Sequence, residues 1–167
     1  ESEGEGLVGF IGEGAKGRRE ATTRLLNQAF PKVRHLMDVV GTVTVRVPTA
    51  DLLAAVKRVS LVAERNTPLR MIIEDDHIAL EAATGDQAHA SEAIEAQVEV
   101  TGEEKSIEAA GFNPHYLLDA LGALDAPYAH FSFTAPGKPC LITGLATIDG
   151  DQLFDYRHVI MLMRLPS

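Results

Sequence analysis

The stretch Thr42–Val56, with the sequence TVTVRVPTADLLAAV, changes from one hydrophobic period to another at Pro48. Apolar and polar residues alternate up to Val47, which is the pattern of a β-strand with one buried face. Thr49 is placed to cap a helix over about residues 50–64, because its hydroxyl can accept a backbone N–H. The apolar residues of this helix share one face: Leu52, Val56, Val59 and Ala63. The stretch therefore predicts a strand followed by an amphipathic helix.

The same order of elements recurs further along the chain. Asp75-Asp76 predicts a hairpin turn between two strands, and Asn113-Pro114 predicts a second helix, with Asn as the N-cap and Pro in the first helical position. Further strands are expected near residues 69–74, 77–83, 93–100, 106–112, 128–134, 139–143 and 156–165. Two β-α-β-β-β units of about sixty residues predict an α+β fold, with two helices packed on one side of antiparallel sheets.

Composition narrows the class of protein. The chain has 167 residues, of which 46% are hydrophobic, which suits one domain or one domain with a piece of another. No apolar run approaches the ~18 residues that cross a membrane, and the acidic residues at the start do not resemble a secretory signal. A single cysteine, Cys140, cannot form an internal disulfide. We expect a protein of the reducing cytoplasm with no membrane contact.

Charge is distributed unevenly. The formal net charge is −9, yet residues 71–108 contain eleven acids against one base, and residues 13–37 contain six bases against two acids. Such asymmetry is typical of a protein with two surfaces that meet different partners. An acidic face that serves only solubility is an equally good interpretation.

A glycine-rich segment offers a competing function. Gly12, Gly14 and Gly17 match the spacing of a dinucleotide-binding fingerprint, as in a small nucleotide-binding oxidoreductase. That function requires a helix over residues 18–30, which Thr22-Thr23 disfavour, so we favour a hairpin loop. The six histidines lack metal-ligand spacing, and Asp75-Asp76-His77 is better interpreted as a hairpin tip. We expect no metal site and no catalytic residues.

Several segments resemble one family, the bacterial DNA polymerase III beta subunit or sliding clamp, and are most similar to its actinobacterial members. They lie in family order along nearly the whole chain: Thr23–Leu26, Phe30–Arg34, Val56–Val59, Leu61–Asn66, Phe112–Pro114, Tyr116–Asp119 and Met161–Leu165. The resemblance implies the DNA-clamp fold. It also implies that residues 1–37 are the end of a middle clamp domain, residues 38–42 a linker, and residues 43–167 the C-terminal clamp domain.

The function that this resemblance implies is tethering, without catalysis and without a cofactor. Family subunits have three such domains, and two subunits close a ring around duplex DNA, where the ring acts as a processivity factor. The implied partners are double-stranded DNA without sequence specificity, the DNA polymerase III alpha subunit, the clamp loader, other proteins with a clamp-binding motif, and a second subunit. A fragment of a clamp could also act as a free-standing peptide-binding module, and the sequence leaves this alternative open.

The resemblance also places binding surfaces on named residues. Lys57, Arg58 and Arg65 are expected to face DNA, because sliding needs only mobile cations opposite phosphates. Leu61 and Val62 are expected at the subunit interface. The acidic segment is expected to face away from Lys57 and Arg58. A structure with Glu92, Glu95 and Glu99 all on the same surface as these cations would make the DNA-facing assignment wrong.

A hydrophobic peptide-binding groove is the most detailed expectation. Methionines suit such a groove because they are flexible and adapt to several peptides. In the family the last strand ends in Met-Pro-x-Arg-Leu, and here Leu162 replaces that proline; the linker after Leu36 is also shorter than usual. The expected groove residues are Pro31, His35, Leu36, Gly137, Pro139, Val159, Ile160, Met161, Leu162, Met163, Arg164 and Leu165.

Overall fold

The computed structural model describes residues 6–63, 67–84, 88–101 and 106–165. The chain divides into two compact units, Glu1–Lys32 and Val33–Ser167. In the first unit, β1 (Leu7–Gly14) and β2 (Gly17–Arg24) form an antiparallel hairpin in which Leu7 pairs with Arg24 and Gly14 with Gly17. Gly17 has a φ of 96°, a conformation that glycine adopts without strain. Because residues 17–24 are a strand, the hairpin is confirmed and the dinucleotide-binding interpretation is wrong.

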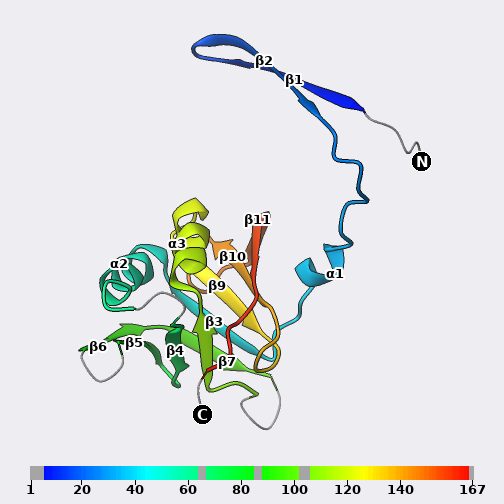
Figure 1. Cartoon of the computed structure of the whole chain (residues 1–167). Helices are drawn as coiled ribbons and strands as arrows, with labels where there is room; N and C mark the ends of the chain where they lie inside the picture. Colours follow the sequence, from blue (N-terminus) through cyan, green and yellow to red (C-terminus); the bar gives the residue numbers. More distant parts are fainter. Residues whose placement is uncertain (1–5, 64–66, 85–87, 102–105, 166–167) are drawn as a thin grey trace. The chain divides into compact units, whose positions relative to one another are not determined.

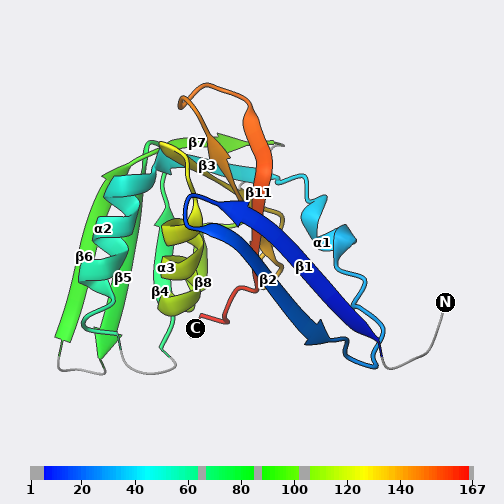
Figure 2. The ribbon, with the colours of Figure 1, turned by 90° about the horizontal axis from the view of Figure 1, so that it is seen from above.

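The second unit contains two antiparallel sheets and the helices α1 (Arg34–Met37), α2 (Thr49–Val59) and α3 (Pro114–Ala123). The five-stranded sheet has the order β11-β10-β9-β3-β7. Its strands are β3 (Val43–Pro48), β7 (Gln97–Val100), β9 (Tyr128–Phe133), β10 (Cys140–Leu145) and β11 (Gln152–Ile160). The four-stranded sheet has the order β6-β5-β4-β8. Its strands are β4 (Leu69–Ile73), β5 (His77–Thr84), β6 (Ala88–Glu95) and β8 (Ala109–Phe112). Helices α2 and α3 contact each other on the same side of the sheets (Figure 1, Figure 2).

The predicted fold class and the order of elements are confirmed, except over residues 93–100. The single strand expected over residues 93–100 is two strands, β6 and β7, which belong to different sheets. The chain changes sheets at Ala96, which is buried and whose N–H donates to the carbonyl oxygen of Asp76 at 3.0 Å. Apolar and polar residues continue to alternate across Ala96, so the sequence pattern alone does not show that the strand pairs with a different strand on each side of this residue.

The two helices begin differently from each other. Asn113 caps α3 as predicted, since its side-chain oxygen accepts the backbone N–H groups of His115 and Tyr116. Thr49 does not cap α2: it is the first helical residue, the N-cap position is Pro48, and the Thr49 hydroxyl is buried without a hydrogen-bond partner. The predicted cap at Thr49 is therefore wrong, and α2 also ends at Val59 rather than near residue 64.

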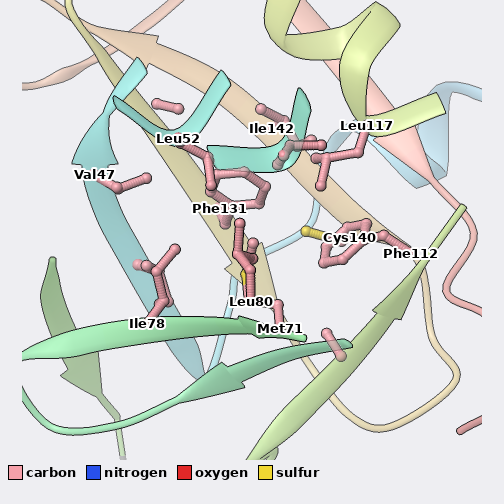
Figure 3. Close-up of a cluster of buried hydrophobic side chains, with 14 of the residues drawn as sticks. Val47, Leu52, Met71, Ile78, Leu80, Phe112, Leu117, Phe131, Cys140 and Ile142 are labelled. Carbon is pink, nitrogen blue, oxygen red and sulfur yellow. The ribbon is translucent and has the colours of Figure 1, made fainter. Parts of the chain in front are cut away.

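One apolar core lies between the helices and the sheets. The alternation in β3 places Val43, Val45 and Val47 in this core, and α2 contributes the predicted face of Leu52, Val56 and Val59. Three phenylalanines, Phe112, Phe131 and Phe133, pack with ring centroids 6.1–6.4 Å apart. Figure 3 shows Phe131 and Phe112 among the buried side chains, together with Cys140, which is part of the core. Within the described ranges, no helix is both long and apolar enough to span a bilayer.

Candidate functional site

The C-terminal segment leaves one sheet and contacts the other. Ile160 is the last residue of β11 and pairs with Cys140 of β10. Three residues later the main-chain N–H of Met163 donates to the carbonyl oxygen of Gly111, at 2.8 Å, so that Met163 forms an isolated bridge with β8. The side chain of Met161, between these two points, is 62% exposed. The segment after Ile160 is thus not the continuous buried strand that its apolar sequence predicts.

Gly111 makes this crossing possible. A Cβ atom at this position would lie 2.7 Å from the carbonyl oxygen of Met163 and 3.0 Å from a methyl carbon of Leu165. Contacts that short require the chain to move, so the segment can lie this close to β8 only because residue 111 has no side chain. Sequence reasoning did not select Gly111, although a glycine inside a strand is a known sign of close backbone approach.

A surface hollow of about 590 Å³ opens beside the C-terminal segment. Its lining combines Gly137, on the loop before β10, with the four consecutive residues Leu162–Leu165, all of which were expected in the groove. Gly137 has a φ of 72°, which lets the loop turn at this point. Five further lining residues were not expected: Ala109, Ala110, Gly111, Pro136 and Lys138. Lys138 and Arg164 add positive charge to the margin of the hollow.

Other residues expected in the groove lie outside this hollow. Pro139, Val159, Ile160 and Met161 do not line it, although Val159 and Ile160 lead directly into the lining segment. Pro31 belongs to the other compact unit.

Helix α1, which packs against β11, carries the exposed His35 and the half-buried Leu36. Asp38 follows α1, and one of its carboxylate oxygens lies 3.6 Å from a guanidinium nitrogen of Arg157 on β11. The Arg157 guanidinium in turn lies over the ring of Phe154, 4.7 Å from its centroid.

The exposed face of α2 carries the cations expected to meet DNA. Lys57 is exposed, whereas Arg58 is bound by Glu92 of β6 through two hydrogen bonds of 2.6 Å, Nε to Oε1 and Nη2 to Oε2. The expectation that the acidic segment faces away from Lys57 and Arg58 is therefore wrong at Glu92, and also at Glu95, which lines the same hollow as Arg58. Glu99 lies elsewhere, beside Arg46 at 3.6 Å. Arg65 lies outside the described residues.

Beyond the end of α2, the two residues expected at a subunit interface differ in burial. Leu61 is 85% exposed, while Val62 packs partly against the core. Successive N–H groups here bond to carbonyl oxygens three residues earlier, Leu61 to Arg58 and Val62 to Val59, so the chain tightens into a last turn. This turn leaves a large apolar side chain in solvent at the end of a helix.

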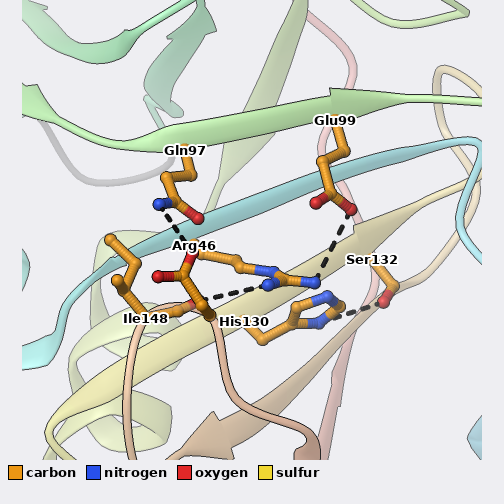
Figure 4. Close-up of polar contacts among 7 residues, drawn as sticks. Arg46, Gln97, Glu99, His130, Ser132 and Ile148 are labelled. Atoms are coloured by element: carbon orange, nitrogen blue, oxygen red, sulfur yellow. Dashed lines mark hydrogen bonds and ion pairs between the residues drawn. The ribbon is translucent and has the colours of Figure 1, made fainter.

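A buried polar cluster covers the outer face of the five-stranded sheet, and sequence reasoning missed it. Arg46 on β3 pairs across the sheet with His130 on β9 and donates a hydrogen bond to the carbonyl oxygen of Ile148, at 3.1 Å (Figure 4). His130 is only 2% exposed, and its Nδ1 lies 3.4 Å from the hydroxyl of Ser132. Burial, followed by the charge of Arg46, lowers the pKa of His130 to about 4. His130 is therefore neutral in the folded protein near pH 7.

The cysteine and the possible metal ligands bear on chemical roles among the described residues. Burial raises the pKa of the Cys140 thiol well above its usual value, which makes it a poor nucleophile. Over the part of the chain that the structure describes, no group of three or more His, Cys, Asp or Glu side chains could hold a metal ion.

The sequence and structural comparisons with known proteins indicate the same family and the same fold. The family DNA polymerase III beta subunit, C-terminal domain, matches residues 32–164. The beta sliding clamp of Streptomyces coelicolor is 44% identical over 97% of this chain, and the beta sliding clamp homolog GriR of Streptomyces muensis is 36% identical over 89%. Among solved structures, the DNA polymerase III beta subunit of Thermotoga maritima has a TM-score of 0.73 at 23% identity, over 92% of this chain and 39% of its own.

The chain is shorter than these relatives. It spans 41% of the S. coelicolor protein and 38% of GriR. The match to the family nevertheless covers most of the chain, and both relatives are more than 30% identical over most of its length. The chain therefore belongs to the family of DNA polymerase III beta subunits, the sliding clamps.

Proposed function

We propose that this chain is the C-terminal part of a processivity clamp, a non-catalytic protein that tethers a polymerase to duplex DNA and binds its partners through short peptides. Residues 1–37 would be the end of the middle domain, residues 38–42 the linker, and residues 43–167 the C-terminal domain. The proposal depends most on one observation. After Ile160 the C-terminal segment leaves β11 and forms a bridge to β8 at Met163, and a hollow of about 590 Å³ lies beside it.

The hollow suits an apolar peptide with an acidic or polar flank. Leu162, Met163 and Leu165 offer apolar surface at its lining, and the thioether of Met163 can adapt to more than one side chain. Lys138 and Arg164 lie at the same lining and would favour a partner with negative charge near its apolar residues. As support from a relative, the sliding clamp of Pseudomonas aeruginosa has been solved bound to griselimycin.

The expected affinity is modest. Burying one Leu or Phe side chain stabilises a complex by about 1.5–3 kcal/mol. Two such anchors, reduced by the cost of ordering a short peptide, correspond to dissociation constants of about micromolar size. Weak single contacts suit a clamp that exchanges one partner for another.

The DNA-facing and subunit surfaces form a second part of the proposal. Lys57 and Arg58 on α2 would face the phosphates, and Leu61 with Val62 would meet a second subunit, which would cover the exposed side chain of Leu61. The partners would be double-stranded DNA, the DNA polymerase III alpha subunit, the clamp loader and other proteins that carry a clamp-binding motif. We expect the isolated chain to bind linear duplex weakly and with strong salt dependence.

A peptide titration tests the groove. A fluorescent peptide with the Gln, Leu and Phe of a clamp-binding motif is titrated against the 167-residue chain, against Met163→Asp, and against Leu61→Asp as the matched control. Both variants introduce the same charge at an apolar residue, but only Met163 lines the hollow. We expect Met163→Asp to weaken binding about tenfold or more, because the carboxylate would lose its water against an apolar side chain. Equal affinity for all three proteins would place the peptide site elsewhere.

A further inference from the structure

Arg58 and Glu92 form a two-point ion pair between a helix and the edge of a sheet. Both hydrogen bonds are 2.6 Å long, in the fork-to-fork arrangement that is the strongest form of an arginine–carboxylate contact. The hydrogen bond from Arg58 lowers the pKa of Glu92, and the hydrogen bond to Glu92 raises the pKa of Arg58. Each group therefore holds the other in its charged form.

The surroundings of this pair are acidic. Glu92 lies on β6, an edge strand of the four-stranded sheet, which packs against α2. A hollow of about 420 Å³ between α2 and β6 is lined by Arg58 and by three carboxylates: Asp51, Glu92 and Glu95. Lys57, the neighbour of Arg58 on α2, is exposed, and none of the ion pairs among the described residues includes it. The two adjacent cations of α2 therefore differ: Lys57 is exposed to solvent, whereas the charge of Arg58 is already balanced by the carboxylate of Glu92.

We propose that Glu92 is a positioning residue that holds Arg58 against the edge of the sheet. Duplex DNA can then bind Lys57 directly, whereas a phosphate can bind Arg58 only in competition with Glu92. This inference rests on the DNA-facing role of α2 proposed above. A phosphate that binds Arg58 must displace a carboxylate that already satisfies two N–H groups. The pair therefore limits how strongly α2 holds any one phosphate, which favours movement along the duplex over residence at one place.

Removing the charge of Glu92 should release one cation for phosphate contact. Each phosphate neutralised on B-DNA contributes about 0.9 to the slope of log K against log salt. Glu92→Gln should therefore steepen the slope by about 0.9 and raise affinity for a linear duplex by roughly three- to tenfold at about 50 mM salt. Glu95→Gln is the matched control, because it removes the same charge from the same strand without an ion pair to Arg58.

The experiment measures fluorescence anisotropy of a labelled duplex with the full chain at several salt concentrations. A second comparison repeats Glu92→Gln in an Arg58→Gln background, where its effect should fall to that of Glu95→Gln if Glu92 acts through Arg58. A merely structural role for Glu92 would not change the salt slope. Circular dichroism confirms that each variant is folded.

Lys57→Gln separates this inference from the proposed function. If Lys57→Gln weakens binding and Glu92→Gln exceeds Glu95→Gln as described, both proposals are supported. If Lys57→Gln weakens binding but the two glutamate variants behave alike, the positioning role of Glu92 is overturned and the DNA-facing role of α2 stands. If Lys57→Gln leaves both affinity and slope unchanged, α2 does not face DNA, and the inference fails with it.

Discussion

Stability should depend on pH through His130, because this imidazole is buried beside a cation. Its pKa is about 4 in the folded chain, against a usual value of 6.5. Between these two values, His130 is protonated in the unfolded chain but mostly neutral in the folded chain. The stability that depends on neutral His130 is fully present above pH 6.5. It is lost as the pH falls from 6.5 towards 4, since the unfolded state binds more protons over that range.

The magnitude follows from the distance between the two pKa values. At 1.36 kcal/mol for each pKa unit, the loss relative to neutral pH should be about 2 kcal/mol at pH 5 and about 3 kcal/mol at pH 4. The groups near His130 that carry charge are Arg46 and, beyond it, Glu99, whose carboxylate lies 3.6 Å from Arg46.

The assay is urea unfolding followed by far-ultraviolet circular dichroism, since the chain contains no Trp. Free energies of unfolding of the wild type and of His130→Gln are measured from pH 8 to pH 4. Carboxylates titrate in both proteins and cancel in the difference, so the variant should lose about 3 kcal/mol less than the wild type over this range. Parallel curves would refute the reasoning, whatever the stability of the variant at neutral pH.

Two substitutions and one labelling experiment test individual features. Gly111→Ala should displace the C-terminal segment, because a methyl group would lie 2.7 Å from the Met163 carbonyl oxygen; faster hydrogen exchange at the Met163 N–H and weaker peptide binding would show this, and unchanged exchange would contradict it. Thr49→Val should stabilise the fold by about 1–2 kcal/mol in urea unfolding, because it removes a buried hydroxyl without a partner; a loss of stability would show that the hydroxyl is satisfied. Cys140 should react with a thiol reagent only after unfolding, because it is fully buried; rapid labelling of the folded chain would place it near solvent.

The order of the elements could be predicted because its signals are local. Alternation in β3, helical spacing in α2 and the Asn113-Pro114 cap each depend on residues a few positions apart. The division of residues 88–100 between two sheets could not be predicted in this way. Both halves alternate, and their different partners, β5 and β3, are chosen by packing over long stretches of sequence.

The candidate site was less accessible to sequence reasoning. A count of charges placed eleven acids in one segment, but it could not show that Glu92 faces α2 while Glu99 lies beside β3. A single apolar run, Val159–Leu165, likewise hid the point at which the chain leaves one sheet for the other. The contact of Met163 with Gly111 joins residues far apart in the sequence, and neither residue signals the other.

The direct continuation of β6 into β7 affects how the second unit unfolds. One uninterrupted piece of backbone serves as an edge of both sheets, with Ala96 as the joint. The sheets also share the C-terminal crossing at Met163, a further direct link that is far from Ala96 in the sequence. Separating them would strip hydrogen bonds from β5 and β3 together. The two sheets are in this sense one cooperative unit, and a disturbance that loosens either of them is transmitted to the other through the backbone itself.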